Sequence, residues 1–67
     1  MTRETYNFVM DVKFGTPKAI LVTDGVEDYW LPRSQVFSPD METYNIEAGD
    51  RITIFIEEWL AREKGLI

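Results

Sequence analysis

A chain of 67 residues with a net charge of −5 and 45% hydrophobic residues allows one domain, residues 1–67, with a small core. It has no cysteine and no histidine, which excludes disulfides, thiolate or imidazole metal sites and a histidine base. We therefore expect no metal, no other cofactor and no catalytic residues. The acidic balance disfavours duplex DNA, whose binding needs lysine and arginine. Because the core is small, a homodimer would be a further source of stability.

No run approaches the roughly 20 apolar residues of a membrane span. Residues 1–4 lead directly into a strand pattern without the apolar core of a signal peptide. We therefore expect a cytoplasmic protein that does not contact a membrane.

Two strands are predicted in the first third of the chain. Residues 6–14 alternate between apolar and polar side chains, which predicts a half-buried strand with Tyr6, Met10 and Phe14 on one face. After a break at 15–17, the unbroken apolar run 19–22 predicts a central strand over residues 18–23.

A β-hairpin follows, because Asp24-Gly25 separates the apolar run from an aromatic one. Both residues tolerate the positive φ of a tight primed turn. The strand then returns over residues 26–31, and Pro32 ends it because proline lacks an amide donor. Residues 33–35 are predicted to form one helical or irregular turn.

The remaining pattern predicts short strands at 36–37 and 41–46, then a clear strand at 51–56 with its isoleucines on one face. A short helix begins at Glu57, carries a Glu58–Arg62 pair, and ends with Gly65 in a left-handed conformation. Trp59 and Leu60 would dock this helix on the sheet.

These elements predict a mainly β (α+β) fold. We expect a small antiparallel sheet or a partly open SH3-like or OB-like barrel of about four or five strands with a short C-terminal helix.

Three strings of the sequence carry a family resemblance: Lys18 to Val22 before an Asp-Gly turn, Trp-Leu-Pro-Arg-Ser-Gln at 30–35, and Trp-Leu-Ala with Lys-Gly-Leu at 59–66. Together they resemble small uncharacterised acidic proteins encoded by phages and prophages. The resemblance implies a genomic setting, in which proteins of this size are often inhibitors of host defence, including anti-CRISPR proteins, or helpers of replication and recombination.

The aromatic pair Tyr29 and Trp30 is the first candidate for binding a partner. Neighbouring strand residues face opposite ways, so one ring packs inward and the other could anchor a protein or stack on a base. The sequence leaves open which ring is outward, and packing within the sheet is the alternative role. Three polar residues follow, either as a recognition cluster or as turn caps: Arg33, Ser34 and Gln35.

Carboxylates form the second candidate. One group surrounds the hairpin turn: Asp24, Glu27 and Asp28. Another lies in later loops: Asp40, Glu42, Glu47 and Asp50. Either they form a solvated face, or they imitate a phosphate track and occupy a groove that normally holds nucleic acid. Their spacing is not that of a calcium loop.

We expect a non-enzymatic phage or mobile-element protein that binds a host protein, such as a nucleic-acid-handling defence complex, through an acidic and aromatic surface. The alternative is a single-stranded nucleic-acid-binding module for phage replication or recombination. It requires the basic residues to gather on one face: Lys13, Lys18, Arg33 and Arg51. A third possibility is a homo-oligomer whose interface holds a small ligand.

Overall fold

The computed structural model describes residues 4–67, which form a four-stranded antiparallel sheet in the order β3-β2-β1-β4 and one short helix. The strands are β1 (Thr5–Gly15), β2 (Ala19–Thr23), β3 (Asp28–Pro32) and β4 (Arg51–Glu57), and the helix is α1 (Glu58–Glu63). Two 3₁₀ turns, η1 (Arg33–Gln35) and η2 (Thr43–Asn45), lie between β3 and β4. The predicted mainly β fold is therefore confirmed as an open sheet with a C-terminal helix.

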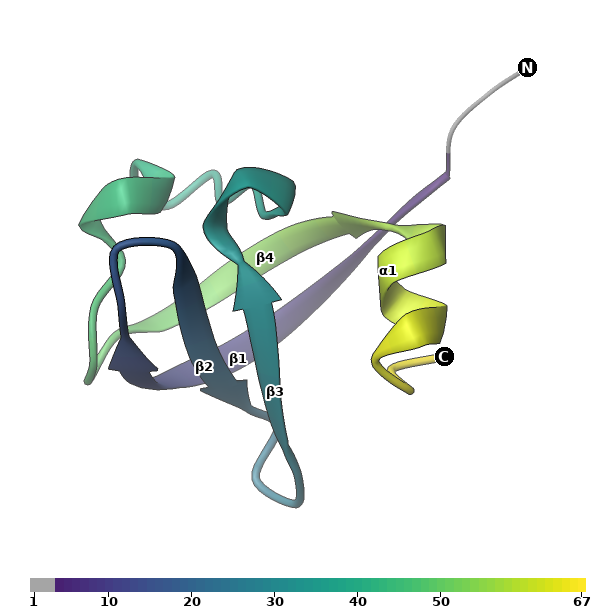
Figure 1. The fold of residues 1–67 in the computed structure, drawn as a ribbon, viewed down its shortest axis with the longest axis horizontal. Coiled ribbons are helices and arrows are strands. Elements are labelled where there is room, and N and C mark those ends of the chain that lie inside the picture. The colour runs from purple at the N-terminus through teal and green to yellow at the C-terminus, as the bar shows by residue number, and fades with distance from the viewer. Residues whose placement is uncertain (1–3) are drawn as a thin grey trace.

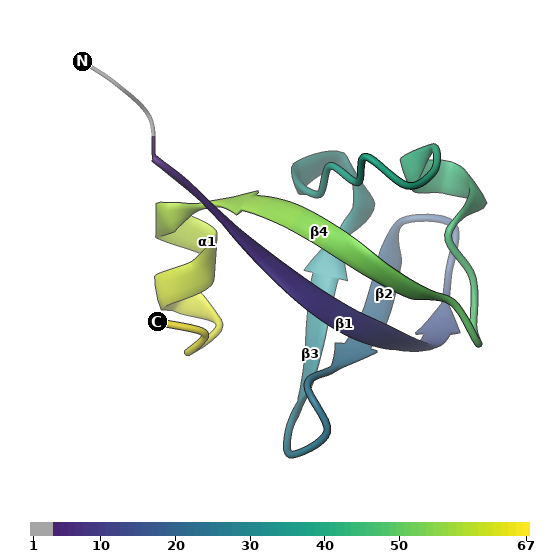
Figure 2. The same cartoon turned by 180° about the vertical axis from the view of Figure 1, so that it is seen from behind.

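The long strand β1 joins two halves of the sheet. Residues 5–11 pair with β4, and residues 11–15 pair with β2. Figures 1 and 2 show β2 and β3 running across the β1–β4 pair, with α1 beside the start of β1. This arrangement encloses a core that the strands, the loop after β3 and α1 all supply. Its members are Met10, Val12, Ile20, Val22, Leu31, Val36, Ile46, Ile52, Ile54, Ile56, Leu60 and Ala61.

A bulge in β1 overturns the prediction that Phe14 shares the face of Met10. The register with β2 shifts between Val12 and Phe14, so one extra residue, Lys13, turns the phenyl ring to the opposite face. Val12 is buried, whereas Phe14 is 55% exposed.

The hairpin is confirmed, but its turn is not the predicted two-residue primed turn. Thr23 pairs with Asp28, so the reversal takes residues 24–27, and the only positive φ there is 99° at Gly25. The return strand accordingly begins at Asp28 and ends at Pro32, as the missing proline amide requires.

Two predicted strands between Pro32 and β4 do not form. Residues 43–45 make the turn η2, which leaves Tyr44 exposed and Ile46 buried. The predicted strand at 36–37 reduces to one bridge, in which Phe37 and Phe55 exchange backbone hydrogen bonds of 3.0 and 2.7 Å. The predicted turn at 33–35 is confirmed as η1.

The helix end is as expected. Gly65 has a φ of 78°, its N–H donates to the carbonyl of Arg62, and the N–H of Leu66 donates to the carbonyl of Ala61 at 2.8 Å. Leu60 is buried, but Trp59 is 51% exposed, so the prediction that it docks α1 is wrong. Within residues 4–67 no helix is long and apolar enough to cross a membrane.

Candidate functional site

An apolar row crosses three strands on the face of the sheet away from the core: Phe14, Leu21 and Trp30. Leu21 is the register partner of Phe14 on one side and of Trp30 on the other. The two rings lean toward each other over the half-buried leucine, with centroids 6.3 Å apart in an edge-to-face arrangement. Phe14 stays 55% and Trp30 45% exposed, so the row presents aromatic area to solvent from a rigid sheet.

The structure decides which ring of the aromatic pair faces outward. Trp30 lies on the outer face, while Tyr29 packs partly against the core. The Tyr29 hydroxyl donates to Asp24 Oδ2 at 3.3 Å. Partial burial, then the charges of Asp24 and Glu27, raise the pKa of Tyr29, so it remains a neutral donor at physiological pH.

The carboxylates around the hairpin have structural partners. Asp24 Oδ1 accepts hydrogen bonds from the N–H groups of Val26 and Glu27 at 2.8 and 2.9 Å. The Glu27 bond, then the Val26 bond, hold the pKa of Asp24 below its usual value. Lys13 Nζ donates to Asp28 Oδ2 at 2.9 Å, and this bond lowers the pKa of Asp28. Glu27 keeps its carboxylate exposed beside the turn.

The polar residues after Pro32 divide into one internal and two surface residues. Arg33 Nε and Nη1 donate to the carbonyls of Thr16 and Thr43, each at 2.7 Å. A methyl group on Gly15 would lie 2.7 Å from Arg33 Nη2, so this glycine leaves room for the guanidinium. Arg33 therefore joins three segments, whereas Ser34 and Gln35 are exposed.

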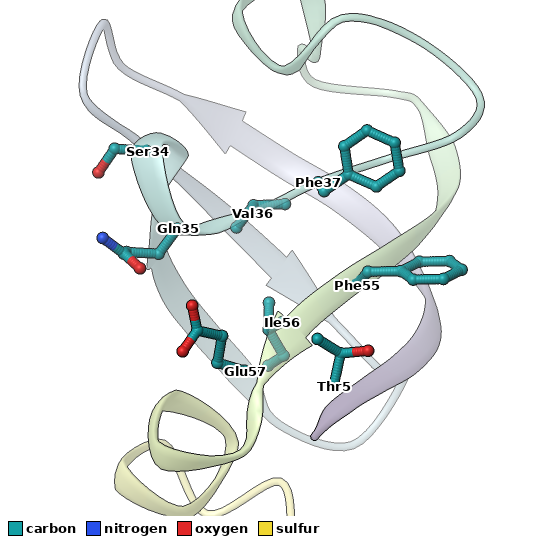
Figure 3. Close-up of a pocket in the computed structure, with 8 residues that line it drawn as sticks. All are labelled: Thr5, Ser34, Gln35, Val36, Phe37, Phe55, Ile56 and Glu57. Carbon is teal, nitrogen blue, oxygen red and sulfur yellow. The ribbon is translucent and has the colours of Figure 1, made fainter. Parts of the chain in front are cut away.

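A shallow groove of about 360 Å³ lies between η1 and the end of β4 (Figure 3). The buried side chains of Val36 and Ile56 form its base, Gln35 and Glu57 lie on one side, and the rings of Phe37 and Phe55 lie on the other. The two rings meet edge to face at 6.0 Å. The lining combines apolar contact with the Ser34 hydroxyl, the Gln35 amide and the Glu57 carboxylate.

Two of the later carboxylates are hydrogen-bonded to backbone amides. Asp40 Oδ2 accepts the N–H of Thr53 at 2.8 Å, and Asp50 Oδ2 accepts the N–H of Glu47 at 3.0 Å. Over residues 4–67 no three carboxylates gather in a way that could hold a metal ion.

The predicted site is therefore only partly assembled. Trp30 and Asp28 lie on β3, and Asp24 and Glu27 lie in the turn before it. Ser34 and Gln35 lie in η1 after β3, where the Arg33 side chain is bound to backbone carbonyls. Phe14 and Leu21 were missed because the alternation over residues 6–14 is unbroken and gives no sign of the bulge.

Comparison of the chain with models of protein families, with curated proteins and with solved structures finds no match.

Proposed function

We propose that the chain is a non-enzymatic accessory protein of a phage or other mobile element, and that it binds a host protein of a defence complex through the apolar row. The observation that carries this proposal is the exposure of Phe14 and Trp30 in register on a sheet. Rigid aromatic side chains lose little conformational entropy on binding and are the commonest anchors of protein interfaces.

Charges beside the row add selectivity. Lys13 and Asp28 pair there, and the Glu27 carboxylate lies at the hairpin tip. With a net charge of −5, the protein would be steered toward a basic surface that carries an apolar pocket. The resemblance to phage and prophage proteins supplies the defence setting.

Contacts of the basic residues give the nucleic-acid alternative less support. Lys13 pairs with Asp28, Arg51 lies 3.7 Å from Asp11, and Arg33 is bound to backbone carbonyls. Only Lys18, of the four residues the alternative needs, has no such contact within residues 4–67. Salt-dependent binding of single-stranded oligonucleotides at low ionic strength would revive this alternative.

The test uses the two tryptophans as a matched pair. Trp30 is 45% and Trp59 is 51% exposed, but Trp59 lies on α1, where its Nε1 donates to Glu57. We expect Trp30→Ala to reduce recovery of a stoichiometric host partner about tenfold or more, and Trp59→Ala to leave it unchanged. Circular dichroism would verify that both variants fold.

The biological readout is phage plating on hosts that carry defence systems. Expression of the wild-type chain should restore plating, and Trp30→Ala should abolish this rescue. Equal loss with Trp59→Ala, or no partner and no rescue with the wild-type protein, would count against the proposal.

A further inference from the structure

The outer edge of β3 is the open end of the sheet (Figure 1). The bonds Arg33 N–H to Lys18 carbonyl and Asp24 N–H to Glu27 carbonyl bracket the β2–β3 ladder. Hydrogen-bonded and non-hydrogen-bonded pairs alternate along an antiparallel ladder. Between these two bonds, the N–H and carbonyl groups of Tyr29 and Leu31 therefore point toward β2, and those of Asp28 and Trp30 point outward. Within residues 4–67, no backbone hydrogen bond joins this outer edge to another segment.

The opposite edge of the sheet is closed. The backbone N–H and carbonyl of Phe55 on β4 are both hydrogen-bonded to Phe37, and the N–H of Thr53 donates to the Asp40 carboxylate. The open edge is short and ends at Pro32, but the outward backbone groups of Asp28 and Trp30 are available to a partner strand.

We infer that this partner is a second copy of the chain, whose β3 pairs antiparallel with β3 so that Trp30 lies opposite Trp30 of the second copy. This register pairs the whole of β3, with Asp28 opposite Pro32 of the second copy. Each Trp30 N–H would donate to the Trp30 carbonyl of the other copy, and each Asp28 N–H to the Pro32 carbonyl. The absent amide of Pro32 costs one bond at each end of the interface and none at the centre.

Charge complementarity selects a second copy and this register. The β2–β3 hairpin is acidic at one end, where Asp24 and Glu27 face each other, and basic at the other, where Lys18 faces Arg33. In the twofold arrangement, the backbone of Glu27 lies opposite that of Arg33 of the second copy, and Lys18 of the second copy follows next along the same row. Because the Arg33 guanidinium is held by the Thr16 and Thr43 carbonyls, the attraction across the interface is between Glu27 and Lys18 of the second copy. The acidic end of each hairpin therefore meets the basic end of the other, and the like-charged ends are kept apart.

Such pairing would also join the apolar rows. Trp30 of each copy would lie beside the other on the outer face, so Phe14, Leu21 and Trp30 would continue into Trp30, Leu21 and Phe14 of the second copy. The dimer would thereby present a larger aromatic surface than either copy alone.

A charge swap tests the register. The Glu27 and Lys18 side chains are exposed, and the hydrogen bond that Glu27 gives to the turn comes from its backbone N–H, so Glu27→Lys and Lys18→Glu should fold normally. At low ionic strength we expect each to raise the dimer dissociation constant about tenfold, and the double variant to restore it. Glu63→Lys and Lys64→Glu make the same changes of net charge on or next to α1 and should have no effect. Sedimentation equilibrium gives the constants.

Hydrogen exchange locates the interface independently. We expect the Trp30 amide to exchange more slowly as protein concentration rises, while the exchange of Leu31, already bonded to β2, changes little. A protein that stays monomeric at millimolar concentration would overturn the inference, as would a dimer with an unprotected Trp30 amide or a double variant without rescue. Protection of Trp30 only after a different protein is added would assign the edge to that protein instead.

Discussion

Arg33 shows how a single side chain can look like a recognition residue in the sequence and be structural in the fold. Its position after Pro32 left two roles open in the sequence, a recognition cluster with Ser34 and Gln35 or a turn cap. The planar guanidinium instead binds two carbonyls that are distant in the chain, those of Thr16 and Thr43. This use of several donors in a fixed geometry is a property of arginine that lysine lacks.

We expect Arg33→Ala to lower the free energy of unfolding by about 2 kcal/mol, because both half-buried carbonyls lose a charged donor. Arg33→Lys should lose nearly as much, since one ammonium cannot reproduce the fork. The control is Arg62→Ala, which removes an exposed pair with Glu58 and should cost no more than about 0.5 kcal/mol. Urea titration measures all three, and an Arg33→Ala variant as stable as Arg62→Ala would show that the two contacts are not formed in solution.

Among the elements, those with local signals could be predicted and those set by distant contacts could not. The β2–β3 hairpin, the stop at Pro32 and the end of α1 at Gly65 follow from residues a few positions apart. The bulge in β1 instead lies close to the point where that strand stops pairing with β4 and pairs with β2. The turn η2 lies where the loop brings Ile46 into the core. For the same reason Trp30 could be named as a candidate, whereas its neighbours in the apolar row could not.

The hairpin depends on pH through Asp24. Its pKa is lowered in the folded state, so the stabilisation is present above the ordinary carboxyl pKa and is lost as pH falls through the folded value. We expect the thermal midpoint to fall as the pH is lowered below about 4. Asp24→Asn keeps an oxygen acceptor for the Val26 and Glu27 amides but does not titrate, so its midpoint should fall less over this range. Equally steep curves for the two proteins would contradict this role of Asp24; Glu63→Gln serves as the control.

For the whole molecule, a small core makes association part of stability. A domain of this size buries less of its surface than larger ones and has little free energy in reserve. Any partner that binds only the folded state adds to that reserve, and a second copy is present whenever the chain is concentrated.

If β3 pairs with β3 of a second copy, the urea midpoint must rise with protein concentration. The gain in unfolding free energy reaches about 2.7 kcal/mol when the subunit concentration is about 100 times the dissociation constant. Glu27→Lys should reduce this concentration dependence, because it replaces the attraction between Glu27 and Lys18 of the second copy by repulsion, and adding Lys18→Glu should bring it back. Glu63→Lys should behave like the wild type. A midpoint that does not depend on concentration in the wild type would show that each copy is stable without the other, and the size of the apolar row available to a host protein would then be that of one chain.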